Sequence, residues 1–171
     1  MLRLVLAAVM IGLAPAAHAA DPEQSQTKPQ ITLQFEVACD KLVACNKLKE
    51  QKKKTVLEFY DAAINQKNFE AAAKFLGPRY VQHNPRAVDG PEGLKTFIAF
   101  LREKFPDYHS DIKRVFADND YVILHVHNVP TPGARGNAIV DIFRLENGKV
   151  VEHWDVRQEI PETAANSNTM F

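Results

Sequence analysis

The chain has 171 residues, of which 21 are Lys or Arg, 21 are Asp or Glu and two are Cys. This length predicts one domain with a core of its own, and a formal net charge of zero argues against nucleic-acid binding, which usually takes a basic excess. Two cysteines are too few for a four-cysteine zinc site or an iron–sulfur cluster.

The first 19 residues have the parts of a secretory signal peptide. Arg3 precedes the apolar stretch Leu4–Leu13, and Ala17-His18-Ala19 supplies the small residues of a cleavage site. The apolar stretch is too short to span a bilayer, which takes about 20 residues. A buried N-terminal helix is the alternative, but no polar face alternates with the apolar residues. We therefore expect cleavage after Ala19 and export to the periplasm or the medium, with no membrane association after cleavage.

We expect residues 20–46 to form a flexible leader, because residues 20–34 are polar and show no sustained period. Its two cysteines, Cys39 and Cys45, would lie about 9 Å apart along a continuous helix, since each residue rises about 1.5 Å. That separation is too large for a disulfide, so a bridge requires a loop or a broken helix. An oxidising compartment and an even number of cysteines favour the Cys39–Cys45 disulfide.

Three helices and one short strand are expected between residues 47 and 105, where apolar residues recur at helical spacing. The second helix begins after the cap residue Asn68 and ends at Gly77-Pro78. The short extended segment Tyr80–His83 follows. The third helix begins at Asp89-Gly90-Pro91, with proline in its first turn, and ends before Pro106.

Four β-rich runs follow, because the hydrophobic period changes to simple alternation. Asn147-Gly148, between the last two runs, is a strong hairpin signal. Helices followed by an antiparallel meander predict one α+β domain over residues 47–160, with the helices covering one face of a curved sheet, and then a polar tail at 161–171. The runs are Tyr108–Ala117, Tyr121–Asn128, Asn137–Leu145 and Val150–Gln158.

Asp141 is the strongest candidate for chemistry, because alternation places it between Ile139 and Phe143 on one strand face. A carboxylate among core residues is costly to bury unless it is paired or hydrated. Such burial raises the pKa of the carboxyl group toward the range that a general base requires. The alternative is that Asp141 faces solvent or pairs with Arg144 or Arg157, and spacing alone does not decide between the two.

The histidines offer fewer signals. His125 and His127 share a strand face, as metal-binding histidines can, but spacing identifies no third ligand and we expect no metal site. His83 lies in Tyr80-Val81-Gln82-His83-Asn84-Pro85, a short strand that leads into a loop of the kind that borders pockets. In the last strand, His153 and Asp155 share a face opposite Trp154.

Common catalytic motifs are missing from the sequence. It contains no Gly-x-Ser-x-Gly elbow, P-loop, GxGxxG or HExxH motif, and we interpret the two cysteines as structural. The remaining possibilities are non-covalent acid–base chemistry in an apolar pocket, or binding alone.

The most specific pattern lies near the C-terminus. Asp141-Ile142-Phe143-Arg144-Leu145-Glu146-Asn147-Gly148-Lys149-Val150-Val151-Glu152-His153-Trp154-Asp155 joins a strand, an Asn-Gly turn and a Glu-His-Trp sequence. It follows Tyr80-Val81-Gln82-His83-Asn84-Pro85 and Asp89-Gly90-Pro91-Glu92-Gly93. With this order of elements, residues 47–158 resemble the SnoaL-like polyketide cyclase family of the nuclear transport factor 2-like superfamily.

The resemblance implies a cone-shaped fold, in which a strongly curved antiparallel sheet wraps around three N-terminal helices and leaves an apolar pocket at the open end. It also implies a homodimer packed through the sheet, and an intramolecular aldol condensation by an acid–base aspartate without cofactor or metal. Asp141 and Asp155 match acidic positions of the strand–turn–strand motif, and either could be the base. His83 matches the histidine of the His-Asn-Pro segment. The epoxide hydrolase branch is disfavoured, because its Arg-x-Asp pairing on one strand is absent.

These features predict an exported, cofactor-free acid–base enzyme that acts on a small carbonyl compound. Asp141 is the expected general base or acid, with His83 or His127 as proton partner or oxyanion donor and Asp155 as the second acidic candidate. The alternative is a non-catalytic ligand-binding or assembly module with the same cone, because fold does not fix function. The residues expected to line the pocket are Tyr80, Asn84, His153 and Trp154.

Overall fold

The computed structural model describes residues 22–171, so the predicted signal peptide, residues 1–19, lies outside the described part. The chain divides into two compact units, one that ends at Lys41 and one that spans Leu42–Phe171. Helix α1 (Pro22–Tyr60) provides the described part of the first unit and the first segment of the second. None of the described helices combines the length and the apolar character that crossing a membrane requires.

Residues 22–46, which we expected to be a flexible leader, form the first part of helix α1. This segment contains no glycine and has several Gln, Glu, Lys, Leu and Ala residues, which favour helix. Cys39 and Cys45 both lie in α1, and both are free and exposed. The predicted disulfide is not formed, because an unbroken helix holds residues at this spacing too far apart to bond.

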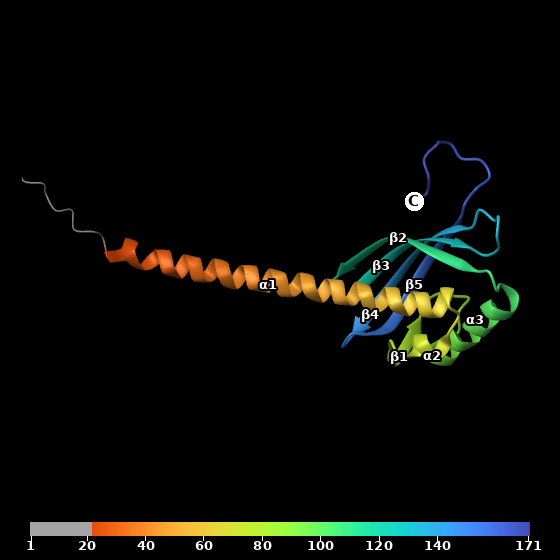
Figure 1. Ribbon diagram of the computed structural model, residues 1–171, viewed down its shortest axis with the longest axis horizontal. Coiled ribbons are helices and arrows are strands. Elements are labelled where there is room, and N and C mark those ends of the chain that lie inside the picture. Colours follow the sequence, from red (N-terminus) through yellow and green to blue (C-terminus); the bar gives the residue numbers. More distant parts are fainter. Residues whose placement is uncertain (1–21) are drawn as a thin grey trace, which may run out of the picture. The chain divides into compact units, whose positions relative to one another are not determined.

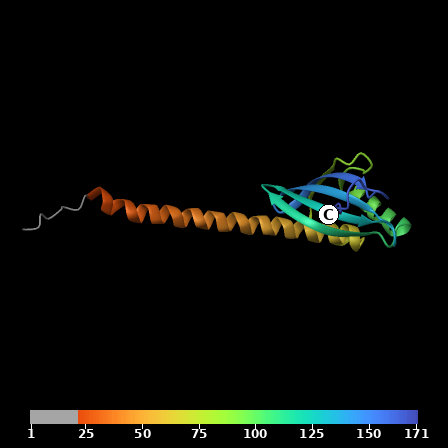
Figure 2. The ribbon, with the colours of Figure 1, turned by 90° about the horizontal axis from the view of Figure 1, so that it is seen from above.

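The second unit contains a five-stranded sheet with the strand order β1-β5-β4-β3-β2 (Figures 1 and 2). β2 to β5 form the predicted antiparallel meander. β1 runs parallel to β5, so the sheet is mixed rather than wholly antiparallel as we expected. The strands are β1 (Leu76–Gln82), β2 (His109–Asp118), β3 (Tyr121–Val129), β4 (Asn137–Glu146) and β5 (Lys149–Glu159).

The helices of the second unit cover one face of this sheet, here called the inner face. α1 continues into a π-helical turn, η1 (Asp61–Asn65), which is followed by α2 (Phe69–Ala73) and α3 (Gly90–Lys104). The Asn68 side chain accepts a hydrogen bond from the Ala71 backbone N–H at 3.0 Å, so Asn68 caps α2 as predicted. The result is the α+β arrangement that the sequence indicates.

The hydrophobic core lies between these helices and the inner face. Alternation along each strand sends every second side chain to the opposite side of the sheet, here called the outer face, where Ile123, His125 and His127 of β3 are only partly buried. Core residues from the helices and strands include Val56, Phe59, Tyr60, Ile98, Val122, Leu124, Val126, Ile139, Phe143 and Leu145.

The hairpin between β4 and β5 determines which residues of these two strands face each other. Asn147 and Gly148 have φ angles of 50° and 73°, the left-handed conformations that a tight hairpin turn requires. The pairing then shifts register between Arg144 and Leu145. Without this β-bulge, the register of the turn would pair Asp141 with Trp154. With the bulge, Asp141 pairs with Asp155.

Candidate acid–base site

A group of polar and charged side chains lies on the inner face, within the otherwise apolar core. Asp141 of β4 is opposite Asp155 of β5, and alternation places His153 and Arg157 on the same face as Asp155. On the neighbouring strands, Ser110 of β2 and Asn128 of β3 are buried and paired with each other. The sheet therefore gathers on one face polar groups that are far apart in the sequence.

Asp141, His153 and Gln82 form a chain of two hydrogen bonds. His153 Nε2 lies 3.0 Å from Asp141 Oδ1, and His153 Nδ1 lies 2.9 Å from Gln82 Oε1. The Asn84 backbone N–H donates to the same Gln82 atom at 3.1 Å, which identifies that atom as the amide oxygen. Because an amide oxygen only accepts, His153 Nδ1 carries a proton. A neutral His153 therefore presents an acceptor, Nε2, to Asp141.

Asp141 Oδ1 and His153 Nε2 consequently share one proton. Either a protonated Asp141 donates to a neutral imidazole, or an imidazolium donates to a carboxylate. Asp141 is only 5% exposed, and its burial raises the pKa of its carboxyl group, while the hydrogen bond with His153 acts in the opposite direction. Burial is the larger effect, so it favours the neutral form of Asp141.

The second oxygen of this carboxyl group, Asp141 Oδ2, is buried without a hydrogen-bond partner among the described residues. The Tyr60 hydroxyl is close enough to lower the pKa of Asp141, but the hydrogen bond that it makes in the structure, a long one of 3.4 Å, goes to Ser110 Oγ. An unpaired buried oxygen costs free energy. Oδ2 is thus the atom of this site whose capacity to accept a hydrogen bond is unused among the described residues.

Two tyrosine hydroxyls border the same carboxyl group. Burial raises the pKa of Tyr60 and of Tyr80, and the nearby charge of Asp141 raises both further. Both side chains therefore stay protonated at ordinary pH and can act as hydrogen-bond donors. Neither would serve as a base.

Asp155 has a different partner from Asp141. Asn84 Nδ2 donates to Asp155 Oδ2 at 2.9 Å, and Asn84 Oδ1 accepts from the Arg86 backbone N–H at 2.8 Å. The loop after β1 thus reaches the inner face through Asn84. The two facing carboxyl groups are distinguished by their neighbours, an imidazole for Asp141 and an amide for Asp155.

His83 and His127, which we expected to be proton partners of Asp141, lie on the other side of the sheet. His83 Nε2 is 2.8 Å from Glu152 Oε1, and the ring of His83 stacks on the outer-face residue Trp154 with centroids 4.4 Å apart. His127 Nε2 is 2.8 Å from the backbone carbonyl oxygen of Arg135. The structure therefore does not bring either histidine to Asp141.

Of the residues predicted to line a pocket, Tyr80, Asn84 and His153 lie near Asp141, whereas Trp154 is on the outer face. Sequence reasoning placed His153 only among the pocket residues and did not consider Gln82. That His153 and Asp155 share a strand face could have indicated that they act together. Their position opposite Asp141 could not be predicted, because it depends on the β-bulge.

Aromatic side chains fill the space next to Asp141. The Phe143 ring contacts Phe59 and Tyr60 edge to face, at centroid distances of 5.8 and 6.3 Å, and stacks on His153 at 4.6 Å. The ring of Phe59 also meets that of Tyr80 at 6.2 Å. The apolar pocket that we expected is not open beside Asp141, because these aromatic side chains fill the apolar interior there.

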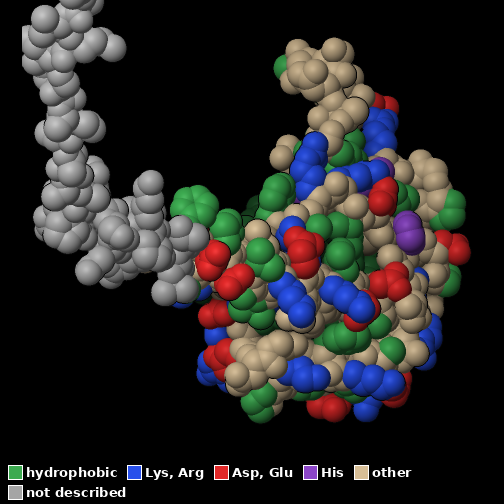
Figure 3. Space-filling view, turned by 60° about the vertical axis from the view of Figure 1, so that its left-hand side comes forward, with side chains coloured by type: hydrophobic (Ala, Val, Ile, Leu, Met, Phe, Trp, Pro, Cys, Tyr) green, Lys and Arg blue, Asp and Glu red, His purple; other side chains and the backbone are tan. Residues whose placement is uncertain are grey.

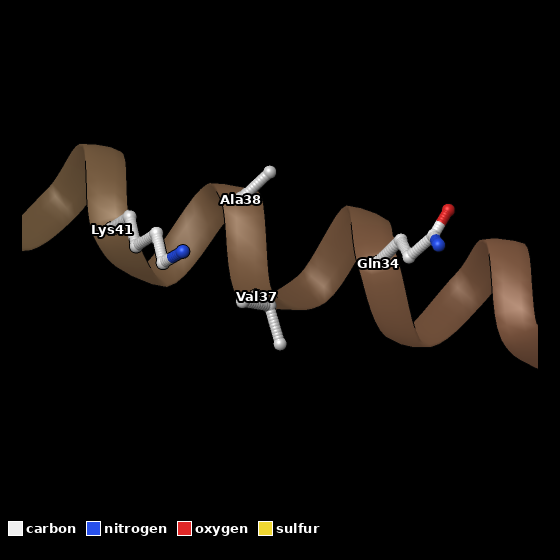
Figure 4. Close-up of a pocket in the computed structure, with 4 residues that line it drawn as sticks. All are labelled: Gln34, Val37, Ala38 and Lys41. Carbon is white, nitrogen blue, oxygen red and sulfur yellow. The ribbon is translucent and has the colours of Figure 1, made fainter.

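Two hollows lie on the described part of the surface, and neither is lined by Asp141 or its hydrogen-bond partners. One is bordered by Gln34, Val37, Ala38 and Lys41 of α1, and Figure 4 shows these side chains leaving the helix in different directions, so they do not converge on one point. The other, of about 490 Å³, lies between the loop after β3 and the end of β5. It is lined by Pro130, Ala134, Arg135, Gly136, Asn137, Glu159, Ile160, Pro161 and Glu162.

The charged groups of the surface are mixed. Figure 3 shows Lys and Arg side chains interleaved with Asp and Glu side chains over the visible face, as the zero formal net charge leads one to expect. Among the side chains that the structure describes, those of residues 34–171, no three His, Cys, Asp or Glu are grouped so that they could hold a metal ion.

Comparisons with known proteins identify the fold. A family model described as SnoaL-like polyketide cyclase matches residues 54–165. A candidate polyketide cyclase from Bacillus cereus is 21% identical with a TM-score of 0.55, and the match covers 63% of this chain and 74% of that one. A candidate ketosteroid isomerase from Kribbella flavida is 17% identical with a TM-score of 0.56, covering 69% and 85%. TsrD from Streptomyces laurentii is 20% identical with a TM-score of 0.53, covering 62% and 87%. No curated protein matches the chain.

The raised pKa of Asp141 predicts how the protein's stability varies with pH. A carboxyl group whose pKa is higher in the folded state stabilises the fold below its unfolded pKa of about 3.9, and this contribution is lost as the pH rises through the folded pKa. The free energy of unfolding of the wild type, minus that of Asp141→Asn, should therefore fall from about pH 4 upward. Urea denaturation of both proteins across this range measures the difference. Asp118→Asn, at an exposed site, is the matched control, and a difference that rises with pH would contradict the prediction.

Proposed function

The chain belongs to the SnoaL-like polyketide cyclase family, and from this premise we propose that it is a cofactor-independent acid–base enzyme acting on a small carbonyl compound. The observation that carries the proposal is the buried pair Asp141–His153, in which Asp141 Oδ2 has no hydrogen-bond partner among the described residues and His153 Nε2 shares a proton with Oδ1. The reaction class is an aldol-type cyclisation or a related isomerisation.

The pair supplies what proton abstraction next to a carbonyl group requires. When the shared proton lies on His153 Nε2, Asp141 is a carboxylate. It then removes a proton from the carbon beside the carbonyl, and the electron pair of that C–H bond moves into an enolate. In a cyclisation, the enolate carbon forms a C–C bond to a second carbonyl carbon of the same molecule, whose oxygen then takes up the proton. In an isomerisation, the proton returns to a different carbon.

His153 and the two tyrosines have separate roles in this scheme. His153 holds the Asp141 carboxyl group in place and shares its proton, with its own tautomer fixed by Gln82. Tyr60 and Tyr80 remain protonated because burial raises the pKa of each. Their hydroxyls are thus suited to donate hydrogen bonds to the enolate oxygen, whose charge develops during the reaction.

The packed interior supports a second candidate, a non-catalytic small-ligand-binding or assembly module with the same fold. Phe59, Tyr60 and Phe143 already fill the volume beside Asp141, so a substrate enters only when these rings change rotamer. An assembly module, which takes up no molecule there, needs no such movement. The two candidates therefore differ in whether Asp141 is reached by a carbonyl compound.

Hydrogen–deuterium exchange tests for catalysis without knowledge of the natural substrate. We expect the protein to accelerate deuterium uptake from D2O at the carbon next to the carbonyl group in some of a panel of small ketones, measured by ¹H NMR. Asp141→Asn should reduce this exchange by about 10²-fold or more, the range of general-base contributions. His153→Gln should reduce it less, because Asp141 remains.

Asp155→Asn is the matched control for this experiment, since it changes the facing carboxyl group in the same way. If Asp155→Asn abolishes exchange and Asp141→Asn does not, the base is Asp155. If the wild type exchanges no ketone faster than buffer does, the binding module is the better description.

We further propose that the protein is exported, on the evidence of the signal-peptide pattern in residues 1–19. A cleavage after Ala19 gives a mature chain that begins with Ala20. N-terminal sequencing or intact mass measurement of the protein secreted by a bacterial host that expresses the full chain should find this terminus. Retention of Met1–Ala19 on all of the protein would contradict export by this route.

We also propose a homodimer that packs through the outer face of the sheet. This face carries an apolar stripe that crosses the strands, in which Val156 is 70% exposed, Phe116 55% and Val140 39%. Exposed stripes of this kind mark association surfaces, and Ile123, Ile142 and Trp154 continue it.

Size-exclusion chromatography with light scattering tests the dimer. We expect Val156→Lys to convert a dimer of 19.2 kDa chains, less the signal peptide, into a monomer, because it places a charge within the apolar stripe. Val88→Lys, at an equally exposed valine (71%) outside the sheet, should leave the dimer intact. A monomeric wild type at micromolar concentration would contradict the proposal.

A further inference from the structure

Arg157 lies at the end of the polar group on the inner face, and its guanidinium points to neutral partners. Its Nη2 donates to the Tyr108 hydroxyl at 3.1 Å and to Asn128 Oδ1 at 3.4 Å. Both partners are well buried, Asn128 completely and Tyr108 to 9% exposure. These contacts hold the guanidinium against the inner face although much of the Arg157 residue is exposed.

No carboxylate pairs with this arginine. Within residues 34–171, whose side chains the structure describes, no Asp or Glu oxygen lies within 4.0 Å of the Arg157 guanidinium, whereas Arg144 on the outer face pairs with both Glu146 and Glu152. A guanidinium has five N–H donors in a planar fork that matches the two oxygens of a carboxylate. The hydrogen bonds of Arg157 in the structure use only Nη2. The remaining donors are available to an anion.

The position of Arg157 relates it to the proposed base. Arg157 is paired with Ile139, and Asp155 with Asp141, so Arg157 and Asp141 are diagonal neighbours on the same face. Such neighbours have backbones about 7–8 Å apart. Burial is the main cause that raises the pKa of the Tyr108 hydroxyl. The charge of Arg157 acts on the same hydroxyl and lowers its pKa, whereas the charges of Asp141 and Asp155 raise it. The guanidinium and the two carboxyl groups therefore share one environment.

We propose that Arg157 binds a carboxylate of the substrate, so that the preferred substrates are short keto acids rather than neutral ketones. This inference rests on the proposed function, because it places the carbonyl end of the molecule at Asp141 and the carboxylate end at Arg157. The arginine is a specificity residue here. It offsets the repulsion that Asp155 and an ionised Asp141 would otherwise exert on an anion.

A pair of matched probes tests the substrate class. The keto acid 4-oxopentanoate and its neutral methyl ester share the same ketone, and differ in the carboxylate. We expect the wild type to bind the acid about ten- to a hundredfold more tightly than the ester in NMR titrations, which corresponds to a charge-assisted hydrogen bond. Arg157→Gln should remove this preference by weakening the acid and leaving the ester unchanged. Arg157→Lys, which keeps the charge without the fork, should retain part of it.

Arg114→Gln is the matched control, since Arg114 is an exposed arginine hydrogen-bonded to the outer-face residue His125. It should leave both affinities unchanged. Thermal unfolding of each variant separates lost binding from lost folding, and the unchanged affinity of Arg157→Gln for the ester serves the same purpose. Equal binding of acid and ester by the wild type, undetectable binding of the acid, or unchanged acid binding by Arg157→Gln would each overturn the proposal.

Failure of this inference can be told apart from failure of the proposed function. If both probes exchange deuterium in an Asp141-dependent manner but Arg157→Gln changes nothing, the acid–base function stands and the carboxylate site is wrong. If the acid binds through Arg157 but neither probe exchanges, the carboxylate site stands and the enzyme is wrong.

Discussion

The site depends on the burial of one carboxyl group in an apolar face. Asp141 lies between Ile139 and Phe143 in the core, where its charged form loses hydration. His153 compensates one oxygen with a hydrogen bond, and Gln82 fixes the imidazole tautomer that makes this bond possible. The other oxygen is left unpaired. The free-energy cost of burying Asp141 and the basicity proposed for it therefore have the same physical cause.

Much of the fold followed from local patterns. The Asn68 cap and the Asn147-Gly148 turn are set by residues next to each other in the chain, and the structure contains both. Strand alternation put Asp141 on one face with Ile139 and Phe143 but did not decide whether that face was buried. The structure buries it, and confirms that His153 and Asp155 lie together opposite Trp154. Features that depend on residues far apart in the chain were harder to predict. No local signal indicated that β1 would lie parallel to β5, and α1 extends through a segment whose polar composition suggested a leader.

The partner of Asp141 could not be predicted from spacing, because it depends on a single extra residue in β5. Counting back from the Asn147-Gly148 turn places Trp154 opposite Asp141, and the bulge replaces it with Asp155. The histidines named from sequence, His83 and His127, each looked suitable in its own segment. For His127, strand alternation was enough to exclude this role, because it places His127 on the face of β3 that points away from Asp141.

The bulge also has an energetic reason of its own. Val150 and Val151 are consecutive, yet both are fully buried, which regular alternation does not allow. A regular register would expose one valine and turn Trp154 and Val156 inward, so it is not excluded by hydrophobic burial alone. What it would lose is the set of inward polar contacts: His153 with Gln82, Asp155 with Asn84, and Arg157 with Tyr108. The pairing of three polar side chains thus selects the observed register, which also buries both valines and assembles the candidate site.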